Sequence, residues 1–79
     1  MNKYHRTLIE NANVIGKAYS GRCVGLSVGR KHLRVILCIN GTTRFAVTGK
    51  TPSDYHSIKN HSKDVKHTYI QLEEILRGR

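Results

Sequence analysis

Pro52, the only proline in the sequence, separates two stretches whose apolar residues follow different periods. Between residues 23 and 48, apolar and polar residues alternate, which is typical of β-strands with one buried face. After Pro52 the apolar residues recur every three or four positions as far as Leu76, which is typical of an amphipathic helix. We therefore expect a sheet followed by a long helix, with Pro52 as a boundary inside one fold.

The predicted fold class is α+β, with the order α-β-β-β-α. Three runs of alternation predict strands at 22–28, 32–39 and 43–49, and helical spacing predicts helices at 3–17 and 52–77. The strands would form an antiparallel sheet with both helices packed on one face and the other face open. A chain of 79 residues holds one core, so we expect a single domain that spans residues 1–79 and that dimerisation could stabilise.

The first predicted hairpin turns at Arg30 and Lys31, which sets Cys23 opposite Cys38 on the open side of the sheet. The geometry allows a disulfide there, but reduced thiols are the expected state in the cytoplasm. The two cysteines lack CxxC spacing, and six strand residues separate His32 from Cys38, so no metal site is expected.

The second hairpin contains Asn40-Gly41, a strong signal for a tight turn. A two-residue loop would place Arg44 opposite Leu37, on the buried face. We therefore expect a three-residue loop that ends at Gly41, which turns Phe45 and Val47 toward the helices and Arg44 toward the open face.

Positive charge is concentrated in the first two-thirds of the chain. Residues 1–51 contain nine Lys or Arg and one Glu, whereas residues 52–79 contain five Lys or Arg and four Asp or Glu. The formal net charge of +9 favours a polyanionic partner. The longest apolar run, Val35–Ile39, is too short to span a membrane, and the N-terminus does not resemble a signal peptide, so a cytoplasmic protein without a membrane partner is expected.

The open face is the candidate site, because alternation places cationic groups on it. Arg and Lys side chains suit phosphate oxygens, and small residues on the first strand would let a nucleic-acid backbone approach closely. Without aromatic residues on this face, a platform for single-stranded bases is not expected, and backbone contact, shape readout or phosphodiester chemistry is favoured. A basic face that only contacts water is the alternative. The residues expected to bind nucleic acid are Arg22, Arg30, Lys31, Arg34, Arg44 and Lys50.

His32 is the candidate catalytic residue. An imidazole with a pKa near 6.5 can act as general acid or base in RNA cleavage, where the 2′-hydroxyl is the nucleophile and no metal or other cofactor is required. An exposed histidine that contacts nothing is the alternative. Four polar residues of the second predicted helix are interpreted as an ordinary solvated face: His56, Asn60, Lys63 and His67.

The α-β-β-β-α order and the sequence Gly29-Arg30-Lys31-His32 at the start of a strand resemble the HicA toxins of bacterial toxin-antitoxin systems. Those proteins have a double-stranded-RNA-binding-domain-like fold and carry a Gly-Ser-His type element at the corresponding hairpin. The resemblance implies a ribosome-independent mRNA interferase with His32 as catalytic residue, Gly29 as turn glycine and an antitoxin-like partner. The segment 51–66 is similar to phage-encoded relatives of that family.

The leading hypothesis is an RNA-binding, HicA-like protein that is a metal-independent endoribonuclease if His32 acts in cleavage. The alternative is a small phage-encoded protein that binds and inhibits a host defence or regulatory factor without catalysis. A duplex-DNA binder is a third reading, although no helix-turn-helix spacing is visible.

Overall fold

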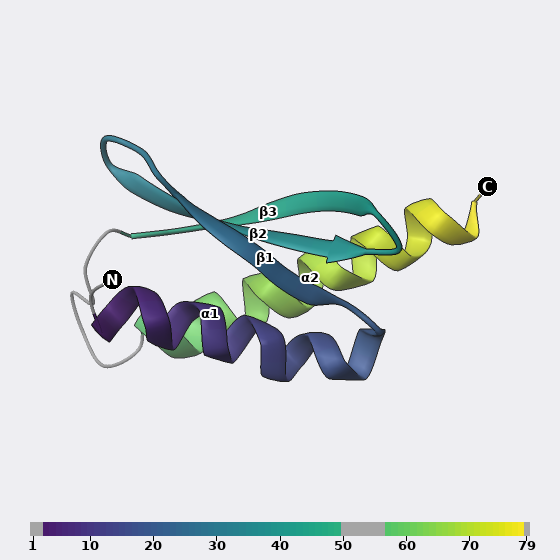
Figure 1. The fold of residues 1–79 in the computed structure, drawn as a ribbon, viewed down its shortest axis with the longest axis horizontal. Helices are drawn as coiled ribbons and strands as arrows, with labels where there is room; N and C mark the ends of the chain where they lie inside the picture. The colour runs from purple at the N-terminus through teal and green to yellow at the C-terminus, as the bar shows by residue number, and fades with distance from the viewer. Residues whose placement is uncertain (1–2, 50–56, 79) are drawn as a thin grey trace.

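The computed structural model describes residues 3–49 and 57–78 (Figure 1). The order is α-β-β-β-α, with one short 3-10 helix after the first α-helix, and the predicted α+β fold class is confirmed. The predicted beginning of the second helix at residue 52 lies outside the described residues. The elements are α1 (Lys3–Gly16), η1 (Lys17–Tyr19), β1 (Arg22–Val28), β2 (His32–Ile39), β3 (Thr42–Gly49) and α2 (Ser57–Arg77).

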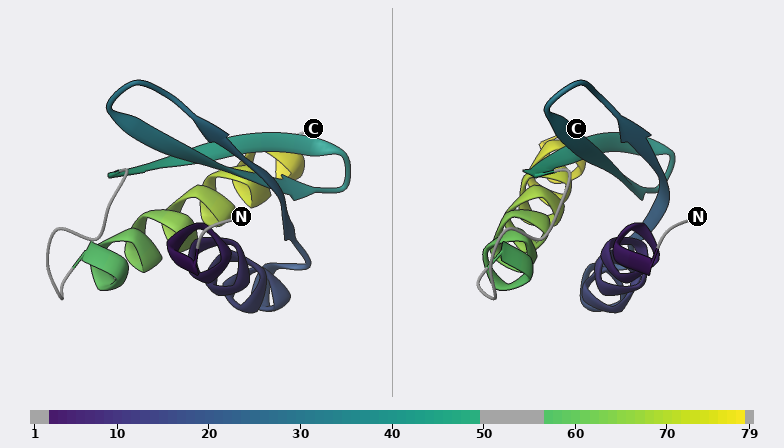
Figure 2. Two further views of the ribbon diagram at one scale, coloured as in Figure 1. Left: turned by 60° about the vertical axis from the view of Figure 1, so that its left-hand side comes forward. Right: turned by 90° about the vertical axis from the view of Figure 1, so that its left-hand side faces the viewer.

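The three strands form one antiparallel sheet in the order β1-β2-β3, so β2 is the central strand. Both helices lie on the same side of the sheet, α1 mainly against β1 and α2 against β3 and β2 (Figure 2). The opposite side of the sheet carries no helix from residues 3–49 or 57–78 and is called the open face below. In the part of the chain that the structure describes, no helix is long and apolar enough to cross a membrane.

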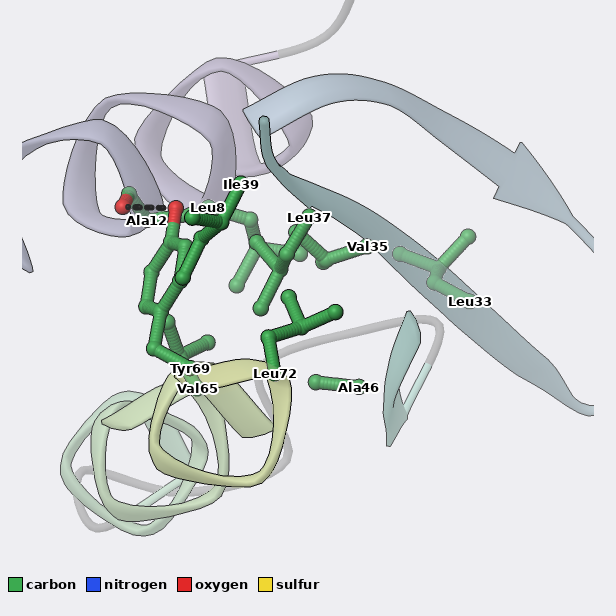
Figure 3. Close-up of a cluster of buried hydrophobic side chains, with 10 residues drawn as sticks. All are labelled: Leu8, Ala12, Leu33, Val35, Leu37, Ile39, Ala46, Val65, Tyr69 and Leu72. Atoms are coloured by element: carbon green, nitrogen blue, oxygen red, sulfur yellow. Dashed lines mark hydrogen bonds between the residues drawn. The ribbon is translucent and has the colours of Figure 1, made fainter. Parts of the chain in front are cut away.

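The core lies between the sheet and the helices (Figure 3). Alternate residues of β2 point into it, which follows from the period of two in a strand. From α2, residues spaced by four and three positions, as in the predicted apolar stripe, meet them, and α1 adds two residues. The buried cluster consists of Leu8, Ala12, Leu33, Val35, Leu37, Ile39, Ala46, Val65, Tyr69 and Leu72.

Tyr69 fixes α1 against α2. Its hydroxyl donates a 2.9 Å hydrogen bond to the carbonyl of Ala12, and its ring stacks on Tyr19 at 5.8 Å between centroids. The chain passes close to this ring, because a Cβ added to Gly16 would lie 2.6 Å from the Tyr69 hydroxyl and one added to Gly21 would lie 2.6 Å from a ring carbon. These two glycines therefore let the end of α1 and the start of β1 approach the core.

Ser62 is a polar residue that interrupts the apolar stripe of α2. Its hydroxyl accepts a 2.9 Å hydrogen bond from the side-chain amide of Asn11 on α1. The interruption therefore marks a polar contact between the two helices in place of an apolar one.

The first hairpin follows the predicted pairing only near its tip. Val28 pairs with Leu33 and Gly25 with Ile36, as a turn at Arg30 and Lys31 requires. Between Cys23 and Gly25 a β-bulge shifts the register by one residue.

The bulge overturns the predicted pairing of the two cysteines. Cys23 lies opposite Leu37 and packs against the core, and its N–H donates to the Asn13 side chain of α1 at 2.9 Å. Cys38 points to the open face, and both thiols are free. The shift also leaves Val24 half exposed.

The second hairpin differs from the prediction by one residue. Its loop has two residues, because Ile39 pairs with Thr42, and the expected three-residue loop is wrong. Asn40 and Gly41 have φ values of +49° and +81°, the left-handed conformation that a type I′ turn requires at both positions. The whole of β3 is therefore inverted relative to the prediction: Ala46 points into the core.

Candidate nucleic-acid interface

The open face is an array of outward-facing side chains in four rows across the three strands. The row at the hairpin tip contains His32 of β2, and the next contains Arg34. A third row contains Ile36 and Phe45, and the last begins with Arg22. Most of the other residues in these rows are small. The side chains that project furthest from the open face are therefore cationic or apolar.

Phe45 and Val47 lie on the open face, where the prediction had turned them inward. Their exposed fractions are 55% for Phe45 and 44% for Val47, in contrast to Ala46 between them, which is buried. An aromatic ring is therefore present on this surface, and the prediction that it lacks one is wrong. Val24 and Ile36 extend the apolar area toward β1.

Arg34 contacts the ring of Phe45. The guanidinium carbon lies 5.2 Å from the ring centroid, within the range of a cation–π contact. Arg34 pairs with Val47 and so belongs to the row next to Phe45 on the side of the hairpin tip. The contact places a positive charge directly beside the exposed aromatic ring.

Arg44 does not share the open face with His32 and Arg34, as had been expected. It pairs with Leu37, whose side chain is in the core, so its own side chain starts on the side of the helices. Its guanidinium donates a 3.5 Å hydrogen bond to the side-chain carbonyl of Gln71 on α2. Because β3 is an edge strand, Arg44 is nevertheless exposed at the rim of the sheet.

A depression of about 590 Å³ lies beside Phe45. Ile36, Thr43 and Phe45 line it from the open face, and Arg44 lines its rim. Thr43 is in the row on the far side of Phe45 from Arg34, so the ring has a cation on one side and a hollow on the other. Its volume is in the range found for small-molecule sites.

The hairpin tip carries three of the predicted site residues. Arg30 and Lys31 form the turn, and His32 begins β2; all three are exposed. The N–H of Gly29 donates to the His32 carbonyl at 2.9 Å and closes the turn, and a Cβ at Gly29 would lie 3.0 Å from that oxygen. The backbone therefore holds His32 at the edge of the open face, two residues along the strand from Arg34.

The other predicted residues lie elsewhere. Arg22 is exposed at the opposite end of the open face, in the row of Cys38. Lys50 lies outside the described residues. On α2, Lys63 and His67 are exposed on the helix, away from the open face, in line with their interpretation as a solvated face.

Acidic residues are absent from the sheet. Residues 22–49 contain five Arg or Lys and no Asp or Glu, whereas Glu10, Asp64, Glu73 and Glu74 are on the helices. No carboxylate of the strands therefore neutralises the cations of the open face. Across the described ranges, no cluster of three or more His, Cys, Asp or Glu is arranged to hold a metal ion.

His61 is a buried polar residue that sequence reasoning missed. It is 2% exposed, and neither ring nitrogen has a hydrogen-bond partner among the described residues. Burial lowers the pKa of His61, and Asp64 opposes this shift. The signal in the sequence was its spacing, since position 61 is four residues before Val65 on the buried side of α2.

No family model, no curated protein and no solved structure matches the chain.

Proposed function

We propose that the protein binds RNA through the open face of its sheet. The supporting observation is the distribution of carboxylates: the strands and their hairpin tip carry five cations, all but Arg44 on the open face or at the tip, and no carboxylate, while the described acidic residues lie on the helices. Lys and Arg that neutralise phosphates release counterions, and this supplies affinity for nucleic acid without any base contact. A cytoplasmic location stays a prediction.

A salt titration tests the proposal. Affinity for a short labelled RNA should fall steeply with salt concentration, because each phosphate contact releases a counterion. Replacing Arg22, Arg30 and Lys31 by Gln should reduce the slope of log K against log salt by about 2, as expected for three lost contacts to a single strand.

The matched control removes the same number of charges from the helices. Arg6→Gln, Lys63→Gln and Lys66→Gln change exposed cations of α1 and α2 and should leave the slope nearly unchanged. Equal losses in the two triple variants would show that net charge alone, and not the open face, drives binding. Tighter binding to DNA of the same sequence and strandedness would exclude RNA as the preferred ligand.

Cleavage at His32, which the resemblance to HicA toxins implies, stays a prediction. His32 and Arg34 share the open face, so an imidazole lies near a phosphate-binding group. His32→Ala should abolish RNA degradation and preserve RNA affinity. Degradation that persists in this variant would remove the enzymatic role, and the binding proposal would stand without it.

A further inference from the structure

We infer that Phe45 is a base-stacking site and that the open face therefore prefers unpaired RNA to duplex RNA. This inference rests on the proposed function and adds the class of RNA that is bound. It reverses the expectation drawn from the sequence, in which Phe45 was part of the core and the open face had no aromatic residue.

The register of β3 places Phe45 and Val47 outside the core and Ala46 inside it. A shift by one residue would bury Phe45 and Val47 and expose Ala46 in their place. The chain instead has Asn40-Gly41 at the turn, which fixes the two-residue loop and the outward position of Phe45. The sequence of the turn therefore determines that the Phe45 ring is exposed.

The surroundings of Phe45 leave room for a flat ligand. In its row, Ile36 is the neighbour on β2 and Gly25 is the neighbour on β1. A Cβ built on Gly25 meets no atom within 4 Å, so the surface is low and open in that direction. On the side of Thr43 lies the depression of about 590 Å³. Because the Arg34 guanidinium lies over one face of the ring, a base approaches the ring from the side of the depression and leaves Arg34 in place.

Charge complementarity identifies the occupant as a nucleotide. The guanidinium carbon of Arg34 lies 5.2 Å from the ring centroid. There the guanidinium can contact the phosphate of a nucleotide whose base stacks on Phe45. Arg22 lies at the other end of the open face and His32 near the tip, so cationic or titratable groups flank the apolar centre on both sides. Aromatic rings interleaved with cations on a sheet are typical of surfaces that bind single-stranded nucleic acid.

A second copy of the chain fits this surface less well. Two open faces packed together would bring Arg22 and Arg34 of each copy near those of the other, with no carboxylate on either sheet to pair with them. Like charges that face each other in an interface oppose association.

Unpaired RNA is expected because the ring can stack only on a base whose face is free. In a duplex the faces of the bases are covered by their neighbours, so a ring on an exposed strand reaches only phosphates and sugars. In a single strand the bases can separate and stack on the ring, and any base serves because each has a π-face. Phe45 should therefore contribute to single-strand affinity and not to duplex affinity.

The experiment compares one unstructured RNA with the same sequence in a duplex, by fluorescence anisotropy. The native chain should bind the single strand more tightly. Phe45→Ala should weaken single-strand binding about 10-fold and leave duplex binding within about 2-fold, since stacking energies of this size are lost only where a base is stacked. The control is Val14→Ala, which removes an apolar side chain that is 65% exposed on α1 and should change neither affinity.

A tryptophan variant gives a second, direct readout. The chain contains no Trp, so Phe45→Trp introduces its only indole. This variant should keep single-strand affinity, and its fluorescence should be quenched by the single strand but not by the duplex. Circular dichroism of each variant shows whether the fold is intact.

The inference is overturned by equal losses of single-strand and duplex affinity in Phe45→Ala, by an unquenched indole in Phe45→Trp, or by a native dimer that Phe45→Ala converts to monomer. If Phe45→Ala has no effect but the triple variant of Arg22, Arg30 and Lys31 loses binding, the stacking site is wrong and the proposed function stands. If the native chain binds no RNA at all, the proposed function itself fails.

Discussion

The two faces of the sheet are built from the same strands but have different constraints. On the helix side, Leu33, Val35 and Leu37 are fully buried in the core between the sheet and the helices. On the open face, Arg34 and Phe45 contact each other and solvent, and no helix covers them. Neighbouring residues on a strand can therefore have different roles, one in folding and the next in binding. Single substitutions can separate the two roles.

The largest effect is expected on the helix side. Leu37→Ala removes a fully buried side chain, and the lost apolar contacts and the remaining cavity should cost about 2–5 kcal/mol of the free energy of unfolding. Phe45→Ala, on the open face, should cost about 0.5 kcal/mol or less. Urea denaturation measures both, and equal costs would mean that the two faces do not differ in their role in folding.

His61 tests the helix side under acid conditions. Its pKa in the folded state is lowered, so the unfolded state, with a pKa near 6.5, binds a proton first as the pH falls. Stability should therefore decrease from about pH 6.5 downward until the folded pKa is passed, by at most about 1.4 kcal/mol per pH unit.

The variant His61→Leu should remove this decrease. It should also be as stable as the native chain at pH 8, because no hydrogen bond to the described residues is lost. Thermal unfolding between pH 8 and pH 5 measures the effect; a native chain whose stability is flat over this range would contradict it.

Tyr69 tests the same side at high pH. Burial raises the pKa of Tyr69 to about 12. The unfolded state ionises first, near pH 10, so stability should fall as the pH rises from 10 to 12. Tyr69→Phe should lose about 1 kcal/mol at neutral pH with its hydrogen bond to Ala12, and its stability should fall less steeply in alkali. Parallel alkaline curves for the two proteins would show that the hydroxyl ionises freely in the fold.

The helix side could be predicted from the sequence because several signals agreed there. On β2 one face consists of Leu33, Val35, Leu37 and Ile39, whereas the other begins with His32 and Arg34. Only the first face could therefore be predicted to be buried. The spacing of Val65, Tyr69 and Leu72 left one buried stripe on α2. The element order and the packing of both helices on one face followed from these patterns.

The open face could not be predicted fully because two signals conflicted on β3. Hydrophobicity favoured burial of Phe45 and Val47, whereas Asn40-Gly41 favoured a two-residue turn that exposes them. The turn prevailed, and Ala46, a small residue, lies where α2 packs against the strand. The sequence of β1 did not predict the bulge at Cys23. The N–H of Cys23 donates to the side chain of Asn13, which lies on α1 ten residues earlier, so the bulge depends on a contact outside the strand.

The smallest expected effect separates the two arginines that the prediction had placed together. Arg34→Gln removes a cation from the open face, beside Phe45, whereas Arg44→Gln removes one whose side chain donates to Gln71 on the helix side. Both variants lower the net charge by one. If the open face binds RNA, Arg34→Gln should reduce the slope of log K against log salt by about 0.7, as expected for one contact to a single strand. Arg44→Gln should change it by less, because its guanidinium starts on the other side of the sheet. A larger reduction for Arg44→Gln would move the binding surface to the rim between β3 and α2, where Arg44 lines a second hollow with Gln71 and Glu74.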